Sequence, residues 1–254
     1  KMSSEVASKK FEGRLKEAKL LKQGMDAIGQ LITECSISAT KDGFEVKAMD
    51  QANVCMLEYN LYNTVFESYK LSEPQTIGLS MTEFNQVLKR AKPTDSINIG
   101  LDNRLEILVG SKRMFVNPLL DISNSATKTP KLDYKSSIEI KVSAIEEALA
   151  DIEVVSDAVI FELEKDKFRM LASQDGKKVE IEMDTDSPEV IRIESSEKSR
   201  SMFPLDYMKK ILVGMKLGEV TKLEIGNNYP IRVTSEVKDQ AKITYVLAPR
   251  VEND

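Results

Sequence analysis

Few residues of this chain have the types and spacing that catalysis needs. The 254 residues include no histidine, which removes the commonest general base, the commonest metal ligand and every Ser/His or Cys/His nucleophilic arrangement. The sequence has no P-loop, GxGxxG or EF-hand pattern. Paired carboxylates are still able to do acid/base work, but their spacing singles out no pair. We therefore predict no catalytic residue, no cofactor and no metal site, and expect a protein that is not an enzyme.

The two cysteines, Cys35 and Cys55, lie among apolar residues without CxxC spacing. This setting predicts reduced core thiols of an intracellular protein. Hydrophobic residues make up 41% of the chain and charged residues 30%, which is typical of a soluble globular protein. No apolar run approaches the roughly 18 residues that a membrane span requires, so we expect no membrane partner.

The C-terminal segment, residues 242–254, begins as a strand and ends in an acidic tail. Proline cannot continue a sheet, so the chain must leave the ladder at Ala248-Pro249 and expose Ala248, Pro249 and Val251. An exposed edge of this kind is a poor place for catalysis. It is a good place for another protein to bind.

Three segments of the first half recur in the second half in the same order. Residues 41–46 are matched by 165–170, the helix-like stretch 80–91 by 203–214, and Asn103 by Asn228 in the turn before a strand. The offset is about 124 residues each time, which indicates duplication. We therefore predict two similar domains.

Both halves alternate strands with helices. The strand-like alternation of apolar and polar residues covers 97–99, 105–109, 179–183 and 190–193. Helical spacing of apolar residues covers 19–34, 81–92, 143–154 and 204–216. Residues 121–131 are rich in Ser, Thr and Asn and include Pro130, so we predict a linker there. Many antiparallel strands with four amphipathic helices indicate an α+β protein.

The polar faces of the four predicted helices differ in charge. The basic residues are Lys19 and Lys22 on the first helix, Lys89 and Arg90 on the second, and Lys209 and Lys210 on the fourth. Since the net charge of the chain is −5, these positions form a local basic surface that suits a polyanion. Ordinary solvated faces are the alternative. The third helix argues against a polyanion, because Glu146, Glu147 and Asp151 are on its polar face.

Four segments carry a family resemblance. Residues 48–54, Ala-Met-Asp-Gln-Ala-Asn-Val, are similar to a Met-Asp-x-x-x-Val loop, and 247–252 read Leu-Ala-Pro-Arg-Val-Glu; residues 88–92 and 118–121 agree with them. In this order and spacing they resemble the sliding clamp family that includes proliferating cell nuclear antigen, especially its archaeal members. The resemblance covers nearly the whole chain.

The resemblance implies two similar DNA-clamp domains per chain, at 11–118 and 134–254, with an interdomain linker at 119–133. Three chains would close into a ring around duplex DNA, with antiparallel sheets outside and the four helices lining the central hole. The family's inner basic positions correspond to Lys22, Lys89 and Arg90, and more loosely to Lys19, Lys209 and Lys210. The third helix departs from the family pattern, because Glu147 and Ala150 stand where relatives often have arginine. Lysine contacts to phosphate carry no base information and so permit sliding.

The resemblance also implies how the ring closes. An edge strand of the first domain, here 105–117, would pair with 176–184 in the second domain of the next chain, which covers two exposed edges. Lys112 and Arg113 near one edge, with Glu180 and Glu182 on the other, offer charge complementarity. The alternative is that these four residues are simply solvent-facing positions of alternating strands.

A pocket for short client peptides is the third implied site. Its matching positions are Met49, Val54, Pro130, Pro230, Ala248, Pro249 and Val251. Thr127 and Thr129 stand where relatives often have larger apolar residues, so we expect a shallower pocket beside the linker. Core packing is the alternative for Met49 and Val54.

The function implied is that of a non-catalytic DNA polymerase processivity clamp. The partners that the resemblance implies are duplex DNA, a DNA polymerase, a clamp loader, a flap endonuclease and a DNA ligase. A homotrimer is expected. One alternative is a subunit of a heterotrimeric or DNA-damage checkpoint clamp, and another is a carboxylate-based, metal-dependent enzyme. The expected location is the cytoplasm, on the nucleoid, for an archaeal protein, or the nucleus for a eukaryotic one.

Overall fold

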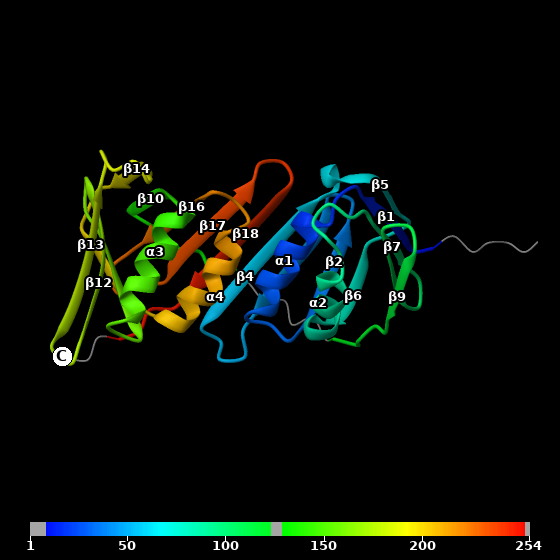
Figure 1. The fold of residues 1–254 in the computed structure, drawn as a ribbon, viewed down its shortest axis with the longest axis horizontal. Coiled ribbons are helices and arrows are strands. Elements are labelled where there is room, and N and C mark those ends of the chain that lie inside the picture. Colours follow the sequence, from blue (N-terminus) through cyan, green and yellow to red (C-terminus); the bar gives the residue numbers. More distant parts are fainter. Residues whose placement is uncertain (1–8, 123–128, 252–254) are drawn as a thin grey trace, which may run out of the picture.

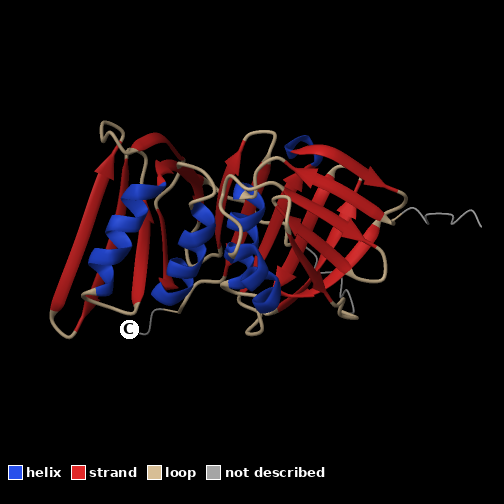
Figure 2. Cartoon of the chain, turned by 45° about the vertical axis from the view of Figure 1, so that its right-hand side comes forward, coloured by secondary structure: helices blue, strands red, loops and turns tan. Residues whose placement is uncertain are grey.

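The computed structural model describes residues 9–122 and 129–251 of the chain. Within that part, four α-helices occur: α1 (Lys19–Gly29), α2 (Met81–Lys89), α3 (Val142–Glu153) and α4 (Leu205–Met215). They lie side by side in the order α3, α4, α1, α2, in front of the sheets (Figure 1). Figure 2 shows the same separation of helices from strands. The predicted α+β class is confirmed.

The strands divide evenly between the two halves. The first half contains β1 (Phe11–Leu15), β2 (Glu34–Thr40), β3 (Gly43–Met49), β4 (Cys55–Tyr62), a 3-10 turn (Asn63–Val65), β5 (Phe66–Leu71), β6 (Gln75–Ser80), β7 (Ile97–Leu101), β8 (Leu105–Val109) and β9 (Arg113–Asn117). The second half contains β10 (Ser136–Lys141), β11 (Ala158–Leu163), β12 (Lys167–Gln174), β13 (Lys177–Asp184), β14 (Val190–Ser195), β15 (Ser199–Pro204), β16 (Val220–Ile225), β17 (Ile231–Val237) and β18 (Ala241–Leu247).

The two halves repeat one topology. The order β5-β1-β7-β8-β9 in the first half corresponds to β14-β10-β16-β17-β18 in the second, and β4-β3-β2-β6 corresponds to β13-β12-β11-β15. Helices α1 and α3 each follow the first strand of their half, and α2 and α4 each follow the sixth. The predicted duplication is therefore confirmed. The strands β18 and β4 pair with each other, so one nine-stranded sheet joins the halves.

Two predicted helices end earlier than their apolar spacing suggests. The first was expected to reach residue 34, but α1 ends at Gly29, and Glu34 already pairs with Ser80 in the ladder between β2 and β6. Leu31 and Ile32 continue the apolar spacing because they pack on the core from the turn, not from a helix. Helix α2 ends at Lys89, a few residues before Pro93, where proline disfavours helical backbone.

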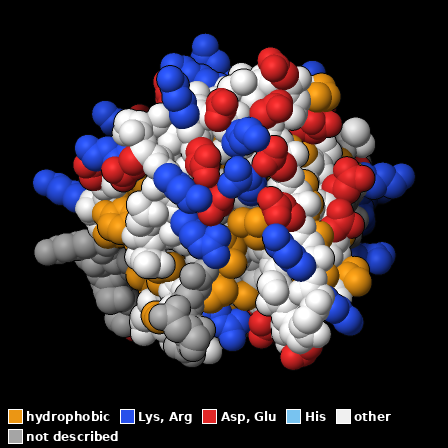
Figure 3. Space-filling model, turned by 90° about the vertical axis from the view of Figure 1, so that its left-hand side faces the viewer, with side chains coloured by type: hydrophobic (Ala, Val, Ile, Leu, Met, Phe, Trp, Pro, Cys, Tyr) orange, Lys and Arg blue, Asp and Glu red, His pale blue; other side chains and the backbone are white. Residues whose placement is uncertain are grey.

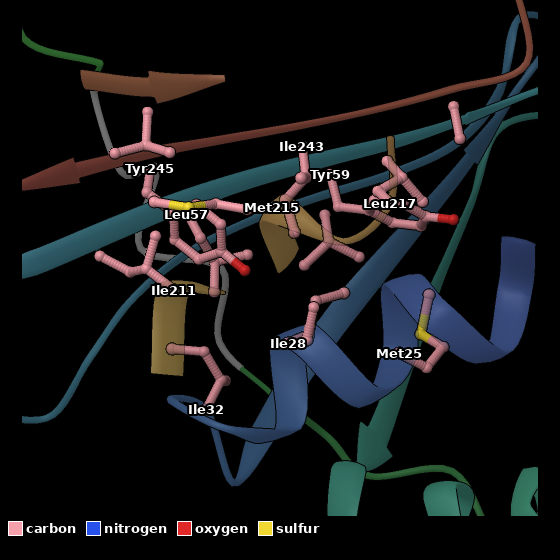
Figure 4. Close-up of a cluster of buried hydrophobic side chains, with 14 of the residues drawn as sticks. Met25, Ile28, Ile32, Leu57, Tyr59, Ile211, Met215, Leu217, Ile243 and Tyr245 are labelled. Atoms are coloured by element: carbon pink, nitrogen blue, oxygen red, sulfur yellow. The ribbon is translucent and has the colours of Figure 1, made fainter. Parts of the chain in front are cut away.

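The joint between the halves, β4 paired with β18, has a tightly packed core (Figure 4). Tyr59 of β4 and Tyr245 of β18 are fully buried there. Each ring occupies space beside a helix glycine: a Cβ on Gly24 of α1 would lie 2.1 Å from Tyr59, and one on Gly214 of α4 would lie 2.0 Å from Tyr245. Glycine at these two positions lets each helix approach its strand closely.

Two strand edges face outward at opposite ends of the molecule (Figure 1). The predicted strand at 105–117 is two strands, β8 and β9, separated by a turn in which Gly110 has a φ of 63°. Of these, β9 forms the outer edge of the five-stranded sheet. The predicted strand at 176–184 corresponds to β13, which forms an edge of the four-stranded sheet.

Candidate functional site

The four helices form one row on one side of the molecule, which we call the helix row. The six predicted DNA-facing cations lie on, or at the ends of, three of these helices, α1, α2 and α4. Lys19 is exposed at the start of α1, and Lys89 and Arg90 are exposed at the end of α2. Lys209 and Lys210 lie on α4. The structure therefore brings the predicted residues to one side of the molecule, but it uses them differently.

Lys22 serves the packing of the first two helices. Its Nζ donates to the carbonyl of Leu88 at 2.7 Å and to the carbonyl of Ala91. These carbonyls belong to the C-terminal end of α2, where a cation is favourable. Burial lowers the pKa of Lys22, although Asp95 and Asp26 act in the opposite direction. Its ammonium group is thus directed toward α2, which sequence reasoning did not anticipate.

The cations of α4 have partners within the chain. Lys209 Nζ lies 2.5 Å from Glu153 Oε1, and Lys216 Nζ lies 2.5 Å from Glu146 Oε1. Both carboxylates come from α3. Lys210 Nζ lies 5.4 Å from the centre of the Tyr207 ring. The acidic α3 therefore offsets much of the positive charge of its neighbour.

Four of the predicted pocket residues meet at one end of the central sheet. In the register of the sheet, β17, β18, β4 and β3 are neighbours, and Pro230, Ala248, Val54 and Met49 flank their ends there. The N–H of Ala248 donates to the carbonyl of Val54 at 2.9 Å. The side chain of Met49 is 36% exposed. This end of the sheet therefore offers partly exposed apolar surface beside the C-terminal strand, with Pro249 next to Ala248.

The other predicted pocket residues are less clearly part of this group. Pro130 is exposed, and its neighbour Thr129 donates to Glu58 in the middle of β4. Thr127 lies outside the described residues. Val251 is 79% exposed, and it follows Arg250, whose N–H donates to the carbonyl of Met202 at 2.7 Å on β15.

Asp50 organises the loop between β3 and β4. Its Oδ1 accepts the N–H groups of Val54 and Cys55, each at 2.9 Å, and its Oδ2 accepts the N–H of Ala52 at 3.3 Å and the hydroxyl of Tyr207 at 2.5 Å. Burial acts to raise the pKa of Asp50, but the Tyr207 hydroxyl and the three N–H donors hold it below its usual value. Tyr207 is a residue that sequence reasoning missed. The sequence did single out the loop that contains Asp50, but it gave no indication of a partner as distant in sequence as Tyr207.

The predicted edge charges lie at the two outward edges, where most of them already have partners. Arg113 lies 2.7 Å from Asp95 and donates to the carbonyl of Arg90 at 2.6 Å. Glu182 contacts Arg169 at 2.8 Å and Lys167 at 3.1 Å, and Glu180 contacts Lys178 at 3.0 Å. Lys112 is exposed in the turn before β9.

The end of the molecule that carries β13 has mixed charge. Figure 3 shows acidic and basic side chains intermixed over this end, with apolar surface between them. Val179 and Ile181 of β13 are half-buried and pack against the core. At the other edge, Phe115 of β9 is half-buried, and Met114 and Val116 are exposed. Each edge thus combines unpaired backbone with incompletely covered apolar side chains.

Among the described residues, no three His, Cys, Asp or Glu side chains are grouped so that they could hold a metal ion. Cys35 and Cys55 are both free and buried, and burial raises the pKa of each thiol to about 12. The prediction of core thiols is confirmed. Across the described ranges, the helices are too short or too polar for a membrane span.

Two family models match the chain. The model described as proliferating cell nuclear antigen, N-terminal domain, matches residues 10–118, and the model of the C-terminal domain matches residues 128–250. The DNA polymerase sliding clamp of Pyrococcus furiosus is 30% identical over 246 residues, covering 95% of this chain and 97% of the relative. The DNA polymerase sliding clamp of Thermococcus gammatolerans is 31% identical over 226 residues, covering 87% of this chain and 91% of the relative.

Two solved structures of relatives have a fold similar to that of this chain. A crystal structure of PCNA from Thermococcus kodakaraensis has a TM-score of 0.88 at 22% identity, covering 94% of this chain and 100% of that one. A structure of A. fulgidus PCNA with the C-terminal region of FEN-1 bound has a TM-score of 0.87 at 29% identity, covering 96% and 100%. The fold is thus that of a two-domain clamp. The chain belongs to the proliferating cell nuclear antigen family, as its motifs predicted.

Proposed function

We propose that this protein is a DNA polymerase sliding clamp, a ring of three copies that encircles duplex DNA and carries no catalytic site of its own. Relatives that align with nearly the whole chain are named DNA polymerase sliding clamps. We place the clamp domains at 11–118 and 134–254, joined by 119–133. As a replication protein, it would act on DNA inside the cell.

One observation carries the proposal of a ring. The chain contains one joint between β4 and β18, and its two outward edges are the topological equivalents of the same two strands. By position in the repeat, β9 corresponds to β18, and β13 corresponds to β4. The edge strand β9 of one copy would therefore pair with the edge strand β13 of a second copy, in the way that β18 pairs with β4 within the chain. Such head-to-tail contacts generate a closed ring when the rotation per copy is right.

The side chains at the edges support the same pairing. Tyr245 faces Leu57 in the ladder of the internal joint. Phe115 stands on β9 where Tyr245 stands on β18, two residues before the end of each ladder, and Val179 stands on β13 where Leu57 stands on β4. We infer that Phe115 faces Val179 of the next copy. That contact would bury apolar surface which a single chain leaves half-covered.

The helix row supports the assignment of the DNA-facing side. Lys19, Lys89 and Arg90 are exposed on it, and sequence-independent contacts to phosphate need only such flexible cations. We keep Lys209 and Lys210 in this set as weaker contributors, because Glu153 lies beside Lys209. Lys22 would contribute mainly by holding α1 against α2.

The end of the sheet formed by Met49, Val54, Pro230, Ala248 and Pro249, which we call the client pocket, is proposed to bind short peptides of other replication and repair proteins. The A. fulgidus relative binds the C-terminal region of FEN-1, and this chain presents partly exposed apolar surface at the ends of four neighbouring strands. A DNA polymerase, a clamp loader, a flap endonuclease and a DNA ligase are the proposed partners. Pro130 and Val251 would form its rim.

Primer extension tests this function. A DNA polymerase from an organism with a similar clamp is given a singly primed circular template, a clamp loader and this protein, with a trap that allows one binding event. We expect product length to increase several-fold when the protein is present. Unchanged product length with a loader that opens the relative from P. furiosus would contradict the proposal.

A further inference from the structure

The client pocket depends on a loop that has little regular structure of its own. Residues 50–54 connect β3 to β4, and Asn53 within them has a φ of 57°. Such left-handed backbone is uncommon for a residue other than glycine and needs support from its surroundings. The support comes from Asp50, which is only 6% exposed and accepts three backbone N–H groups of the loop and the strand that follows.

The fourth donor to Asp50 comes from the other half of the chain. Tyr207 lies in the first turn of α4, and its hydroxyl donates to Asp50 Oδ2 at 2.5 Å. A hydrogen bond to an ionised carboxylate is roughly twice as strong as one between neutral groups. The hydrogen bond to Asp50, followed by burial, raises the pKa of Tyr207. The tyrosine is therefore protonated at neutral pH and remains a donor.

The position of this loop sets the shape of the client pocket. Met49 precedes Asp50, and Val54 accepts the N–H of Ala248 at 2.9 Å, so movement of the loop would shift Met49 and Val54 relative to Ala248 and Pro249. Among the described residues, no other hydrogen bond of the loop reaches a helix of the second half. Tyr207 thus fixes the pocket loop to α4.

We propose that Tyr207 is a positioning residue for the client pocket: its hydroxyl holds Asp50, and through Asp50 the apolar side chains of the loop, in the arrangement that a client peptide requires. The inference rests on the proposed function of the pocket. It adds a residue of α4 that lies outside the five residues that define the client pocket.

The test compares peptide binding by the full chain and by its Tyr207→Phe variant, which keeps the aromatic side chain and removes only the hydroxyl. The probe is a synthetic peptide with the sequence of the C-terminal region of A. fulgidus FEN-1, measured by calorimetry. We expect about a tenfold loss of affinity, the size of one hydrogen bond to a charged group. Amide hydrogen exchange at Val54 and Cys55 should become faster in the free variant, because Asp50 loses its anchor.

A matched control is Tyr69→Phe, since the hydroxyl of Tyr69 also donates a short hydrogen bond, at 2.6 Å to the carbonyl of Thr40. Tyr69 lies on β5, away from the pocket, and its loss should leave peptide affinity unchanged. A second arm measures Tyr207→Phe in an Asp50→Asn background. There the loss caused by Tyr207→Phe should shrink to about threefold, because the acceptor is no longer charged.

Three outcomes overturn the inference. Tyr207→Phe binding the peptide as tightly as Tyr69→Phe would show that the hydroxyl does not position the pocket. A tenfold loss that is undiminished in the Asp50→Asn background would show that Tyr207 acts by another route. Absence of binding by the unaltered chain would overturn the client pocket and the inference together, which distinguishes it from the first two results.

Discussion

The internal joint and the two outward edges are built from equivalent strands, yet they differ in how completely they are packed. At the internal joint, Leu57, Tyr59 and Tyr245 are fully buried. At the outward edges, the corresponding Val179, Ile181 and Phe115 are only half-buried. Equivalent apolar side chains are thus fully buried at the joint within the chain and only partly buried at its two outward edges. This difference separates the contacts that fold the chain from the surfaces that we propose contact a second copy.

The helices beside the two kinds of joint differ in charge. At the internal joint, α1 packs on α4, and Gln23 donates to the carbonyl of Lys216 at 3.4 Å. At the outward edges the equivalent helices are α3 and α2, and in the repeat Glu147 of α3 corresponds to Gln23, and Lys92 to Lys216. In a ring, Glu147 of one copy would therefore approach the basic end of α2 in the next. The acidic third helix, anomalous for DNA contact, would then serve the contact between subunits.

The largest expected effect is at the internal joint. Tyr59→Ala removes a fully buried ring and its hydrogen bond to the carbonyl of Leu20 at 2.9 Å. We expect the free energy of unfolding to fall by about 3–5 kcal/mol, as for other large aromatic truncations in cores. Urea denaturation at fixed protein concentration measures it. A loss below about 1 kcal/mol would mean that the joint is not part of the folding core.

The next effect concerns assembly. Phe115→Ala should weaken the ring by about 2 kcal/mol or more per contact, as truncating a buried aromatic anchor does, and light scattering should then find single chains at micromolar concentration. Met114→Ala is the matched control, because Met114 is a neighbour on the same strand but points to the opposite face. If both variants keep the mass of three chains, or if both lose it equally, the proposed register is wrong.

A smaller effect is expected from charge at the same contact. Glu147→Lys should place a cation against the basic end of α2 in the next copy and weaken the ring by about 1 kcal/mol. Lys92→Glu in the same chain should restore assembly, since the swapped charges attract again. The mass distribution at low and at high salt is the measurement. If the second substitution does not restore assembly, Glu147 does not take part in the subunit contact.

The smallest effect is that of acid. Hydrogen bonds from Arg169 and then Lys167 hold the pKa of Glu182 on β13 below its usual 4.5. A carboxyl with a lowered pKa stabilises the fold above its usual pKa, and this contribution is lost as the pH falls through its folded-state pKa. We therefore expect amide protection in β13 to decrease below pH 4.5 before that of β4 and β18. If amide protection decreases at the same pH in β13, β4 and β18, the proposed difference between the outward edge and the internal joint is wrong.

The fold was largely predictable because its signals are local or repeated. Apolar alternation and helical spacing located the elements, and the repeat of residues 41–46 at 165–170 predicted two similar halves. The end of α1 was missed because Leu31 and Ile32 keep helical spacing while Glu34 pairs with the remote Ser80. Local patterns do not report a ladder with a distant strand.

The candidate sites were predicted less completely, since a sequence position does not reveal what a side chain contacts. Lys22 and Lys209 have the charge of DNA-facing residues, but one donates to the end of α2 and the other pairs with Glu153. Tyr207 and Asp50 are far apart in sequence and meet only through the joint between the halves. The half-buried Phe115 and Ile181 were recognised as edge residues of interest only by comparison with the internal joint.

The central claim is that three copies enclose DNA, and retention by topology tests it most directly. The fluorescently labelled protein is loaded onto a nicked circular duplex by a clamp loader, the loader and free protein are removed, and the bound fraction is followed at a salt concentration that abolishes ordinary phosphate contacts. We predict that the protein stays on the circle and leaves promptly once a restriction enzyme linearises it. Equal dissociation from circular and linear DNA would contradict the account.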